Sequence, residues 1–266
     1  MFKRFFAHLI FAFCIGISQI AWASDMAREK RIADNIKDSL IIGEVVMLKA
    51  NGDEFMALIN NQEPKKIRGS VIILHGMGSN PNSPQITHPL RRQLAELDWI
   101  TASIQLPITA QDASISEDLA LIKESGARIQ VTLDYMHENY KNTPCVLIAH
   151  SLGAIMAANF LANQEKATCD AVVLIGLPTL PSELPEAYSI ELIKKIDIAM
   201  LDIYGSQDLN SVKKLAPTRK LTLKKNNPLN RQIEISGADH AFTGLDETLV
   251  RSIHSWLSYV FKQNNH

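Results

Sequence analysis

The local sequence best suited to nucleophilic chemistry surrounds Ser151. This serine lies within residues 148–154, IAHSLGA, between a buried-strand pattern and a helical pattern. That context is typical of a nucleophile elbow, a sharp turn that raises the serine hydroxyl above a sheet edge. Such a turn needs small residues two before and two after the serine, where this chain has Ala149 and Gly153. The usual motif has glycine at both places. The alternative is a chance serine in a strand–helix turn.

A serine hydroxyl is a weak nucleophile and needs a neighbouring base. Three histidines follow Ser151 along the chain. His254 falls in a helical pattern and His266 is the last residue, whereas His240 lies in a glycine-containing loop after a strand pattern. We therefore expect His240 to be the base. The alternative is a solvent-exposed loop histidine.

The base needs a carboxylate that fixes its tautomer and stabilises the imidazolium. In enzymes with a nucleophile elbow, the acid lies between the serine and the histidine in the sequence. Asp208 follows the strand pattern that ends near Tyr204, so we expect it to be this acid. Asp202 lies within that strand and Asp239 adjoins the histidine, which makes both less suitable. The alternative role for Asp208 is to cap a short helix that follows it.

Acyl transfer also requires donors for the oxyanion. The main-chain N–H of Leu152, at a helix N-terminus, is the first expected donor. The second should come from the loop HGMGSN at residues 75–80, where glycines allow close approach of the backbone, and we expect it to be the N–H of Met77. The alternative is a plain glycine turn.

Two further histidines, His75 and His150, flank these turns, and we interpret them as packing and hydrogen-bonding residues rather than ligands. No spacing of His, Cys, Asp and Glu indicates a metal site. The glycines of residues 75–80 match neither common phosphate-binding pattern. We therefore expect neither a metal nor a cofactor.

The elements that must position these residues alternate between strands and helices. This alternation predicts a mostly parallel sheet, preceded by an antiparallel hairpin around the Asn51-Gly52 turn. The expected strands are 41–48, 54–59, 70–74, 100–106, 145–149, 171–175, 198–204 and 232–235. The expected helices are 25–40, 88–97, 116–140, 152–164 and 247–261.

Residues 177–195 fit no simple strand–helix unit. They contain three prolines and then a short helical stretch. We interpret them as a small cap over the carboxyl edge of the sheet, with an irregular crossover as the alternative.

Together these motifs resemble the α/β-hydrolase superfamily. The resemblance covers about residues 70–261 and rests on LHGMG at 74–78, AHSLG at 149–153, YGSQD at 204–208 and GADH at 237–240. It implies an α/β fold with a central eight-stranded sheet flanked by helices, a short cap between strands six and seven, and an esterase-like mechanism without a cofactor. The pattern looks like a poorly characterised group of exported proteobacterial members.

The first 23 residues have the three parts of a signal peptide. Lys3 and Arg4 precede an apolar run, which ends at Ala21-Trp22-Ala23. We expect cleavage after Ala23, a periplasmic or secreted location, and a single domain over residues 24–266 without a membrane span. The alternative is an uncleaved membrane anchor.

Two cysteines remain after such cleavage, Cys145 and Cys169. In the fold that the resemblance implies, the two cysteines lie at the same end of neighbouring strands. Neighbouring strands in a sheet are about 4.8 Å apart, which is within reach of a disulfide. An exported protein with an even number of cysteines favours a disulfide. A pair of buried thiols is the alternative.

The composition is that of an ordinary globular protein rather than a disordered one. Hydrophobic residues make up 46% and charged residues 21% of the 266 residues, and the formal net charge is −1. This balance gives no electrostatic reason to expect a nucleic-acid partner. We expect hydrolysis of a small-molecule carboxylic ester, with an oligomeric state that the sequence leaves open. Thioesterase, amidase or peptidase activity, or a catalytically idle binding protein of the cell envelope, are the alternatives.

Overall fold

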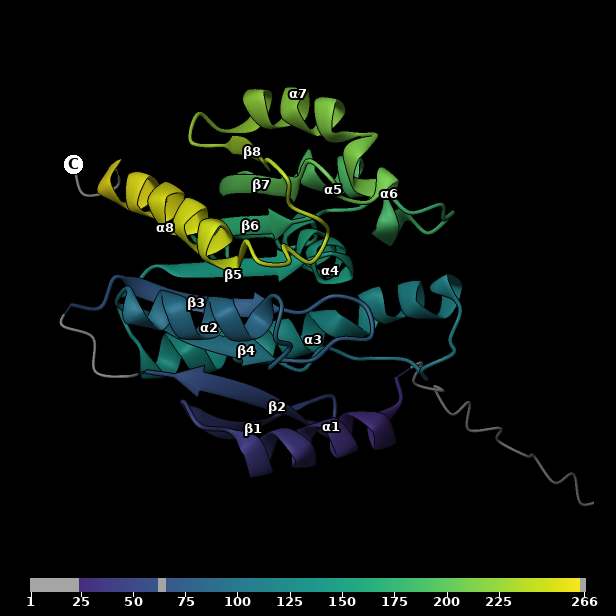
Figure 1. The fold of residues 1–266 in the computed structure, drawn as a ribbon, viewed down its shortest axis with the longest axis vertical. Coiled ribbons are helices and arrows are strands. Elements are labelled where there is room, and N and C mark those ends of the chain that lie inside the picture. Colours follow the sequence, from purple (N-terminus) through teal and green to yellow (C-terminus); the bar gives the residue numbers. More distant parts are fainter. Residues whose placement is uncertain (1–23, 62–65, 264–266) are drawn as a thin grey trace, which may run out of the picture.

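The computed structural model describes residues 24–61 and 66–263. The predicted signal peptide and its cleavage site lie outside the described residues. A single eight-stranded sheet, ordered β1-β2-β4-β3-β5-β6-β7-β8, forms the centre of the protein (Figure 1). The predicted eight-stranded, mostly parallel sheet is therefore confirmed.

Two strands form an antiparallel hairpin and six run parallel. The hairpin strands are β1 (Glu44–Ala50) and β2 (Asp53–Asn60), with positive φ angles at both Asn51 and Gly52 in the turn. β2 then pairs antiparallel with β4. The parallel strands are β3 (Gly69–Leu74), β4 (Trp99–Ile104), β5 (Cys145–His150), β6 (Ala171–Ile175), β7 (Ala199–Gly205) and β8 (Arg231–Ile235).

The strand order reverses between β3 and β5. After β3 the chain crosses to β4 on one side, and then returns to place β5 on the other side of β3. In open parallel sheets, ligands bind at the carboxyl ends of the strands at such a reversal. The loop after β3 and the turn after β5 meet there, and these are the segments that carry Met77 and Ser151.

Helices cover both faces of the sheet. In Figure 1, α2 (Thr87–Glu96) and α8 (Asp246–Gln263) lie in front, whereas α3 (Ile115–Asn139) and α4 (Leu152–Ala162) lie behind. Each pair of helices packs against its own hydrophobic core. α1 (Met26–Ser39) packs beside the hairpin, and α7 (Ala216–Asn226) lies at the opposite end of the sheet. Among the described residues, no helix is long and apolar enough to cross a membrane.

The segment between β6 and β7 is short. It contains a 3₁₀ turn at Pro185–Ala187 and α5 (Ser189–Ile193), which packs on α4 and α7. The predicted cap between strands six and seven therefore has little helical structure, and much of it packs on the domain itself.

Two helices follow β7 that the sequence patterns did not predict as such. α6 (Asn210–Lys213) corresponds to the short helix that Asp208 was considered to cap. α7 is not indicated by the sequence pattern. α7 carries a proline in its first turn and has only a weak apolar stripe, so periodicity alone did not indicate it.

The expected disulfide is not present. Cys145 and Cys169 do lie together at the amino edge of β5 and β6, but both are free, buried thiols with their Sγ atoms 3.9 Å apart. A disulfide requires about 2.05 Å between the sulfur atoms. Burial and the neighbouring thiol allow a hydrogen bond from Cys169 to Cys145 instead, so the alternative of two buried thiols describes the structure.

Candidate active site

Ser151 occupies a strained turn between β5 and α4. Its φ of 54° and ψ of −120° lie in a region that residues other than glycine rarely adopt. The main-chain N–H of Ser151 donates to the carbonyl of Ile175 at 2.9 Å, which ties the turn to the end of β6. A Cβ atom at Gly153 would lie 2.3 Å from the His75 carbonyl oxygen, so only glycine fits there. The tight packing of strand and helix thus explains the small residue at position 153.

The structure brings Ser151, His240 and Asp208 together. His240 Nε2 lies 2.9 Å from Ser151 Oγ, and His240 Nδ1 lies 2.6 Å from Asp208 Oδ1. Because a carboxylate accepts, Nδ1 carries the proton and donates it to Asp208. The Nε2 lone pair then accepts the hydrogen bond of the serine hydroxyl. This is the hydrogen-bonding pattern that a general base and its orienting carboxylate require.

Asp208 is fully buried at the side chain, whereas His240 is 22% exposed. Burial by itself would raise the pKa of Asp208, but the hydrogen bond and charge of His240 and the N–H groups of Leu209 and Gly205 outweigh it and lower that pKa. Asp208 does not cap α6, whose N-cap residue is Leu209 and has no side-chain cap. The carboxylate thus faces the histidine, in its ionised form.

His150 supports the loop that carries His240. Its Nε2 lies 2.9 Å from the main-chain carbonyl of His240, so Nε2 must be the donor. The two imidazole rings also pack together, with centroids 4.7 Å apart. Burial, followed by the charge of His240, lowers the pKa of His150 to about 4, so this ring stays neutral.

Gly176, which follows β6, lies directly beside the Asp208–His240 pair. Its φ is +56°, and an added Cβ would meet His240 Cε1 at 3.0 Å and Nδ1 at 3.1 Å. The chain therefore needs glycine here both for backbone conformation and for space. Sequence reasoning missed this residue, although a glycine that directly follows a buried strand is a usable signal.

The loop that carries Met77 is held by a buried hydrogen-bond chain through His75. His75 Nδ1 donates to the Gly76 carbonyl at 2.8 Å, while Nε2 accepts from the Leu106 N–H at 3.0 Å and lies 3.1 Å from Gln105 Nε2. This pattern fixes one neutral tautomer, in line with burial lowering the pKa of His75 to about 4. The expectation of a hydrogen-bonding rather than ligating role agrees with these contacts.

α1 reaches the same loop region from the edge of the sheet. Glu29 and Arg128 form a buried ion pair of 2.6 Å, and Glu29 also accepts from the Ile108 N–H at 3.2 Å. Arg128 donates to the Gln105 carbonyl at 3.1 Å, which links the pair to the His75 chain. Sequence reasoning did not assign α1 any role near the site, because the contacts of Glu29 cross about 100 residues of sequence.

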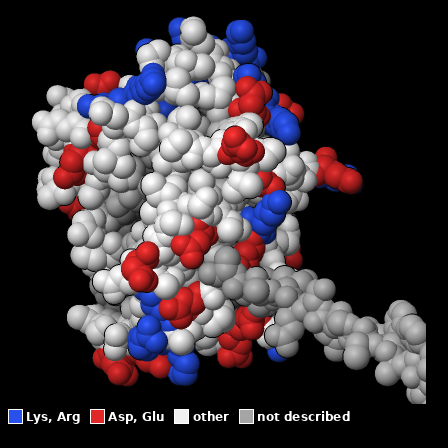
Figure 2. Space-filling model, turned by 90° about the vertical axis from the view of Figure 1, so that its right-hand side faces the viewer, with Lys and Arg blue, Asp and Glu red and all other residues white. Residues whose placement is uncertain are grey.

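A cavity of about 530 Å³ opens over Ser151. We call it the Ser151 cavity. Of the described residues that line it, none is Lys, Arg, Asp or Glu. Figure 2 faces this edge of the sheet, and a broad area in its upper half carries no charged side chain. Lining residues include Met77, Ser79, Ser83, Gln85, Ile86, Ile115, Leu152, Pro178, Leu180, Leu209, Ser211 and His240.

Residues 177–195, interpreted from the sequence as a cap, contribute little to this cavity. Of its apolar residues, only Leu180 lines the cavity, together with Pro178. Leu177 is buried in the core, whereas Leu184 and Tyr188 are exposed. The apolar surface of the cavity comes instead from Ile115, Leu152 and other residues outside the cap.

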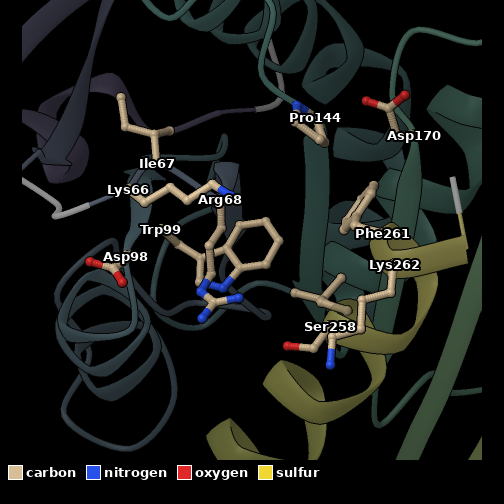
Figure 3. A pocket seen from close by; sticks show the side chains of 11 residues that line it. Lys66, Ile67, Arg68, Asp98, Trp99, Pro144, Asp170, Ser258, Phe261 and Lys262 are labelled. Atoms are coloured by element: carbon tan, nitrogen blue, oxygen red, sulfur yellow. The ribbon is translucent and has the colours of Figure 1, made fainter. Parts of the chain in front are cut away.

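A second, larger cavity of about 690 Å³ lies at the other edge of the sheet (Figure 3). Its lining residues Arg68, Trp99, Pro144 and Asp170 all lie at or just before the starts of parallel strands. The triad residues lie beyond the opposite ends of their strands. The larger cavity is therefore not the place where Ser151 chemistry would occur.

Met77 and Leu152 both line the Ser151 cavity, one on each side of the β3–β5 reversal. The role of their main-chain N–H groups as oxyanion donors stays a prediction. His254, which was not selected from the sequence as the base, lies on α8. Its Nδ1 accepts a hydrogen bond from Trp99 Nε1 at 3.2 Å.

The family model described as "Protein of unknown function (DUF3530)" matches residues 19–126 and 110–259. A search of curated protein sequences finds no significant match. Many solved structures, by contrast, have a fold similar to that of this chain.

Est1E from Butyrivibrio proteoclasticus is similar with a TM-score of 0.65 and 14% identity, over 82% of this chain and 99% of that chain. A serine hydrolase without a lid from Xanthomonas campestris has a TM-score of 0.64 and 12% identity, over 82% of this chain and 94% of that chain. Dienelactone hydrolase from Anabaena variabilis has a TM-score of 0.64 and 19% identity, over 81% of this chain and 96% of that chain. These similarities confirm the α/β-hydrolase fold. They do not bear out the narrower expectation of an exported proteobacterial group.

Proposed function

The chain belongs to the family described as protein of unknown function (DUF3530) and has the fold of α/β serine hydrolases, and from this premise we propose that it hydrolyses carboxylic esters with Ser151 as nucleophile. The fold alone does not determine chemistry, since one fold hosts many functions. The proposal therefore rests on the site.

The observation that carries the proposal is the continuous hydrogen-bond path from Ser151 Oγ through His240 to Asp208, at 2.9 Å and 2.6 Å. These distances lie within the range required of a nucleophile, its base and the group that orients the base. Three residues far apart in the sequence meet in this geometry beside an uncharged cavity. A binding protein without catalysis has no need of that arrangement.

The proposed reaction has two steps. Ser151 Oγ attacks the ester carbonyl carbon and its proton passes to His240 Nε2, which then gives that proton to the departing alcohol oxygen as the carbon–oxygen bond breaks. In the second step water loses a proton to His240 and its oxygen adds to the acyl carbon. The proton returns to Ser151 Oγ as the acid leaves. Asp208 stays ionised throughout and stabilises the imidazolium.

Each tetrahedral intermediate carries a negative oxygen. We assign its stabilisation to the main-chain N–H groups of Met77 and Leu152, the second of which lies at the N-terminus of α4. A donor of this kind typically contributes about 3 to 4 kcal/mol to transition-state binding.

Hydrolysis of a short aryl ester and of the matched aryl amide tests the proposal. We expect the purified protein to cleave the ester, and the Ser151→Ala variant to lose this activity by at least about a thousandfold. Cleavage of the amide but not of the ester would contradict an esterase and favour an amidase or peptidase. A protein that cleaves neither would favour a binding role.

We also propose that residues 1–23 direct export and are removed after Ala23, which places the domain in the periplasm or outside the cell. The support is the sequence pattern of this segment. N-terminal sequencing of the protein from the producing cells tests this, and an intact Met1 would contradict it.

A further inference from the structure

The Ser151 cavity has two walls of different chemistry. The first, which we call the polar wall, carries Ser79, Ser83 and Gln85 from the loop between β3 and α2, which also contributes Met77 and Ile86 to the lining. The second, the apolar wall, carries Ile115, Leu152 and Leu180.

The two walls belong to opposite faces of the sheet. The loop of the polar wall leads into α2, which packs with α8 over one face. Ile115 begins α3 and Leu152 begins α4, and these helices pack together over the other face, where Leu180 joins their core. Ser151 lies at the sheet edge between the walls, so the two parts of an ester bound at Ser151 would contact different surfaces.

His240 identifies the wall that the alcohol part contacts. This residue lies in the loop from β8 to α8, on the same face as α2 and the polar wall. The base must protonate the alcohol oxygen as it leaves, so the alcohol lies on the His240 side of Ser151. The acyl part then extends along the apolar wall.

The polar wall offers neutral hydrogen-bonding groups. Ser83 Oγ donates to Gln85 Oε1 at 3.1 Å in a solvent-exposed contact, which leaves the amide nitrogen of Gln85 as a further donor. The lining contains no Lys, Arg, Asp or Glu among the described residues, so a phosphate, carboxylate or ammonium group would lose water without gaining an opposite charge. A plain alkyl alcohol would form no hydrogen bonds with these groups, whereas an alcohol with further hydroxyl groups would gain them.

We infer that the substrate is an ester between an apolar acid and an uncharged alcohol that carries further hydroxyl groups. This inference rests on the proposed ester hydrolysis at Ser151. Glycerol and sugars share the required alcohol chemistry.

Four octanoyl esters test the inference on the full chain: those of glycerol, glucose, 1-propanol and glycerol 3-phosphate. Glycerol and propanol have the same three carbons and differ only in hydroxyl groups. We expect kcat/KM to be at least about tenfold higher for the glycerol or the glucose ester than for the propyl ester, the worth of one good hydrogen bond. We expect the phosphate-bearing ester to be cleaved at least about tenfold more slowly than the glycerol ester. A higher value for glycerol than for glucose identifies an acylglycerol, and the reverse an acylated sugar.

The variant Gln85→Leu removes the amide of the polar wall. We expect it to lower the ratio of hydroxylated to propyl ester kcat/KM at least about fivefold. Gln164→Leu, beyond the far end of α4, is the matched control and should keep the ratio of the wild type.

The propyl ester cleaved as fast as both hydroxylated esters, or an unchanged ratio in Gln85→Leu, would overturn the inference. Labelling of Ser151 by a fluorophosphonate probe distinguishes failure of this substrate inference from failure of the proposed ester hydrolysis. A labelled protein that cleaves only the propyl ester contradicts the substrate class alone, whereas an unlabelled protein that cleaves no ester contradicts both.

Discussion

His150 donates a hydrogen bond from Nε2 to the main-chain carbonyl of His240 at 2.9 Å, so the residue before the nucleophile holds the backbone of the base. The nucleophile turn and the histidine loop are thereby joined outside the triad itself. Small displacements of a base cost much activity, because proton transfer requires hydrogen-bond distance.

The His150→Phe variant keeps a ring beside His240 but removes this donor. We expect kcat for ester hydrolysis to fall about tenfold, with KM changed less than kcat. His150→Gln restores an N–H donor and should recover part of the loss. Steady-state kinetics of the three proteins check this, and equal kcat values would contradict a positioning role.

Asp208 holds the Nδ1 proton of His240 through a 2.6 Å contact. In Asp208→Asn, an amide replaces the acceptor and can favour the wrong tautomer of the histidine, so we expect kcat to fall about 10³- to 10⁴-fold. Thermal unfolding of the variant should show that it still folds. Asp239→Asn is the matched control: that carboxylate accepts hydrogen bonds within its own loop, from Ala241 and Thr243. A larger loss in the control than in Asp208→Asn would refute the assignment of the acid.

Gly176→Ala adds a methyl group 3.0 Å from His240 Cε1 at a residue with φ of +56°. Gly52→Ala in the hairpin turn is a matched control, since its φ is also positive but nothing lies within 4 Å of an added Cβ. Both should lose about 1 to 2 kcal/mol of unfolding free energy from the backbone. We expect only Gly176→Ala to lower kcat substantially. A similar fall in both variants would show that the effect is not local to the triad.

Burial lowers the pKa of His75 to about 4 in the folded protein, from 6.5. Between these values the unfolded chain binds a proton that the folded protein does not, so the unfolding free energy falls as pH is lowered. When the pH falls below both pKa values, the unfolding free energy is lower by about 3 kcal/mol on account of this residue. The His75→Gln variant has no titrating group at this position.

Urea unfolding at pH 7.5 and pH 5.0 measures this contribution. We expect the stability difference between the wild type and His75→Gln to be smaller at pH 5.0 than at pH 7.5 by about 2 kcal/mol. The same difference at both pH values would mean that His75 titrates alike in both states.

Local sequence patterns carry the triad prediction because each triad residue lies in the turn or loop that follows a strand. Ser151 has a recognisable turn, and His240 and Asp208 were selected by the order of elements and by elimination. The parallel sheet then brings the ends of these strands to one edge. The fold, and the meeting of these three residues at one sheet edge, could thus be predicted from the sequence.

Long-range contacts explain what the sequence did not reveal. The Glu29–Arg128 pair joins α1 to α3, and the Gly176 contact with His240 depends on how three strand ends meet. Neither relationship leaves a periodic pattern. The disulfide expectation failed for a related reason: the topology brings Cys145 and Cys169 together, but topology does not set the distance between two sulfur atoms.

The two-wall description of the cavity also required coordinates. Gln85 and Ile115 are 30 positions apart and lie in segments whose sequence gives no sign of a shared cavity. Their opposition follows from α2 and α3 covering opposite faces of the sheet.

Covalent labelling with a fluorophosphonate probe, read by mass spectrometry of the intact protein and of its peptides, tests most directly whether Ser151 is an activated nucleophile. We expect one probe adduct per chain, located at Ser151, and no adduct in Ser151→Ala or after mild denaturation. A wild-type protein that stays unlabelled, or an adduct that persists in Ser151→Ala, would contradict the account.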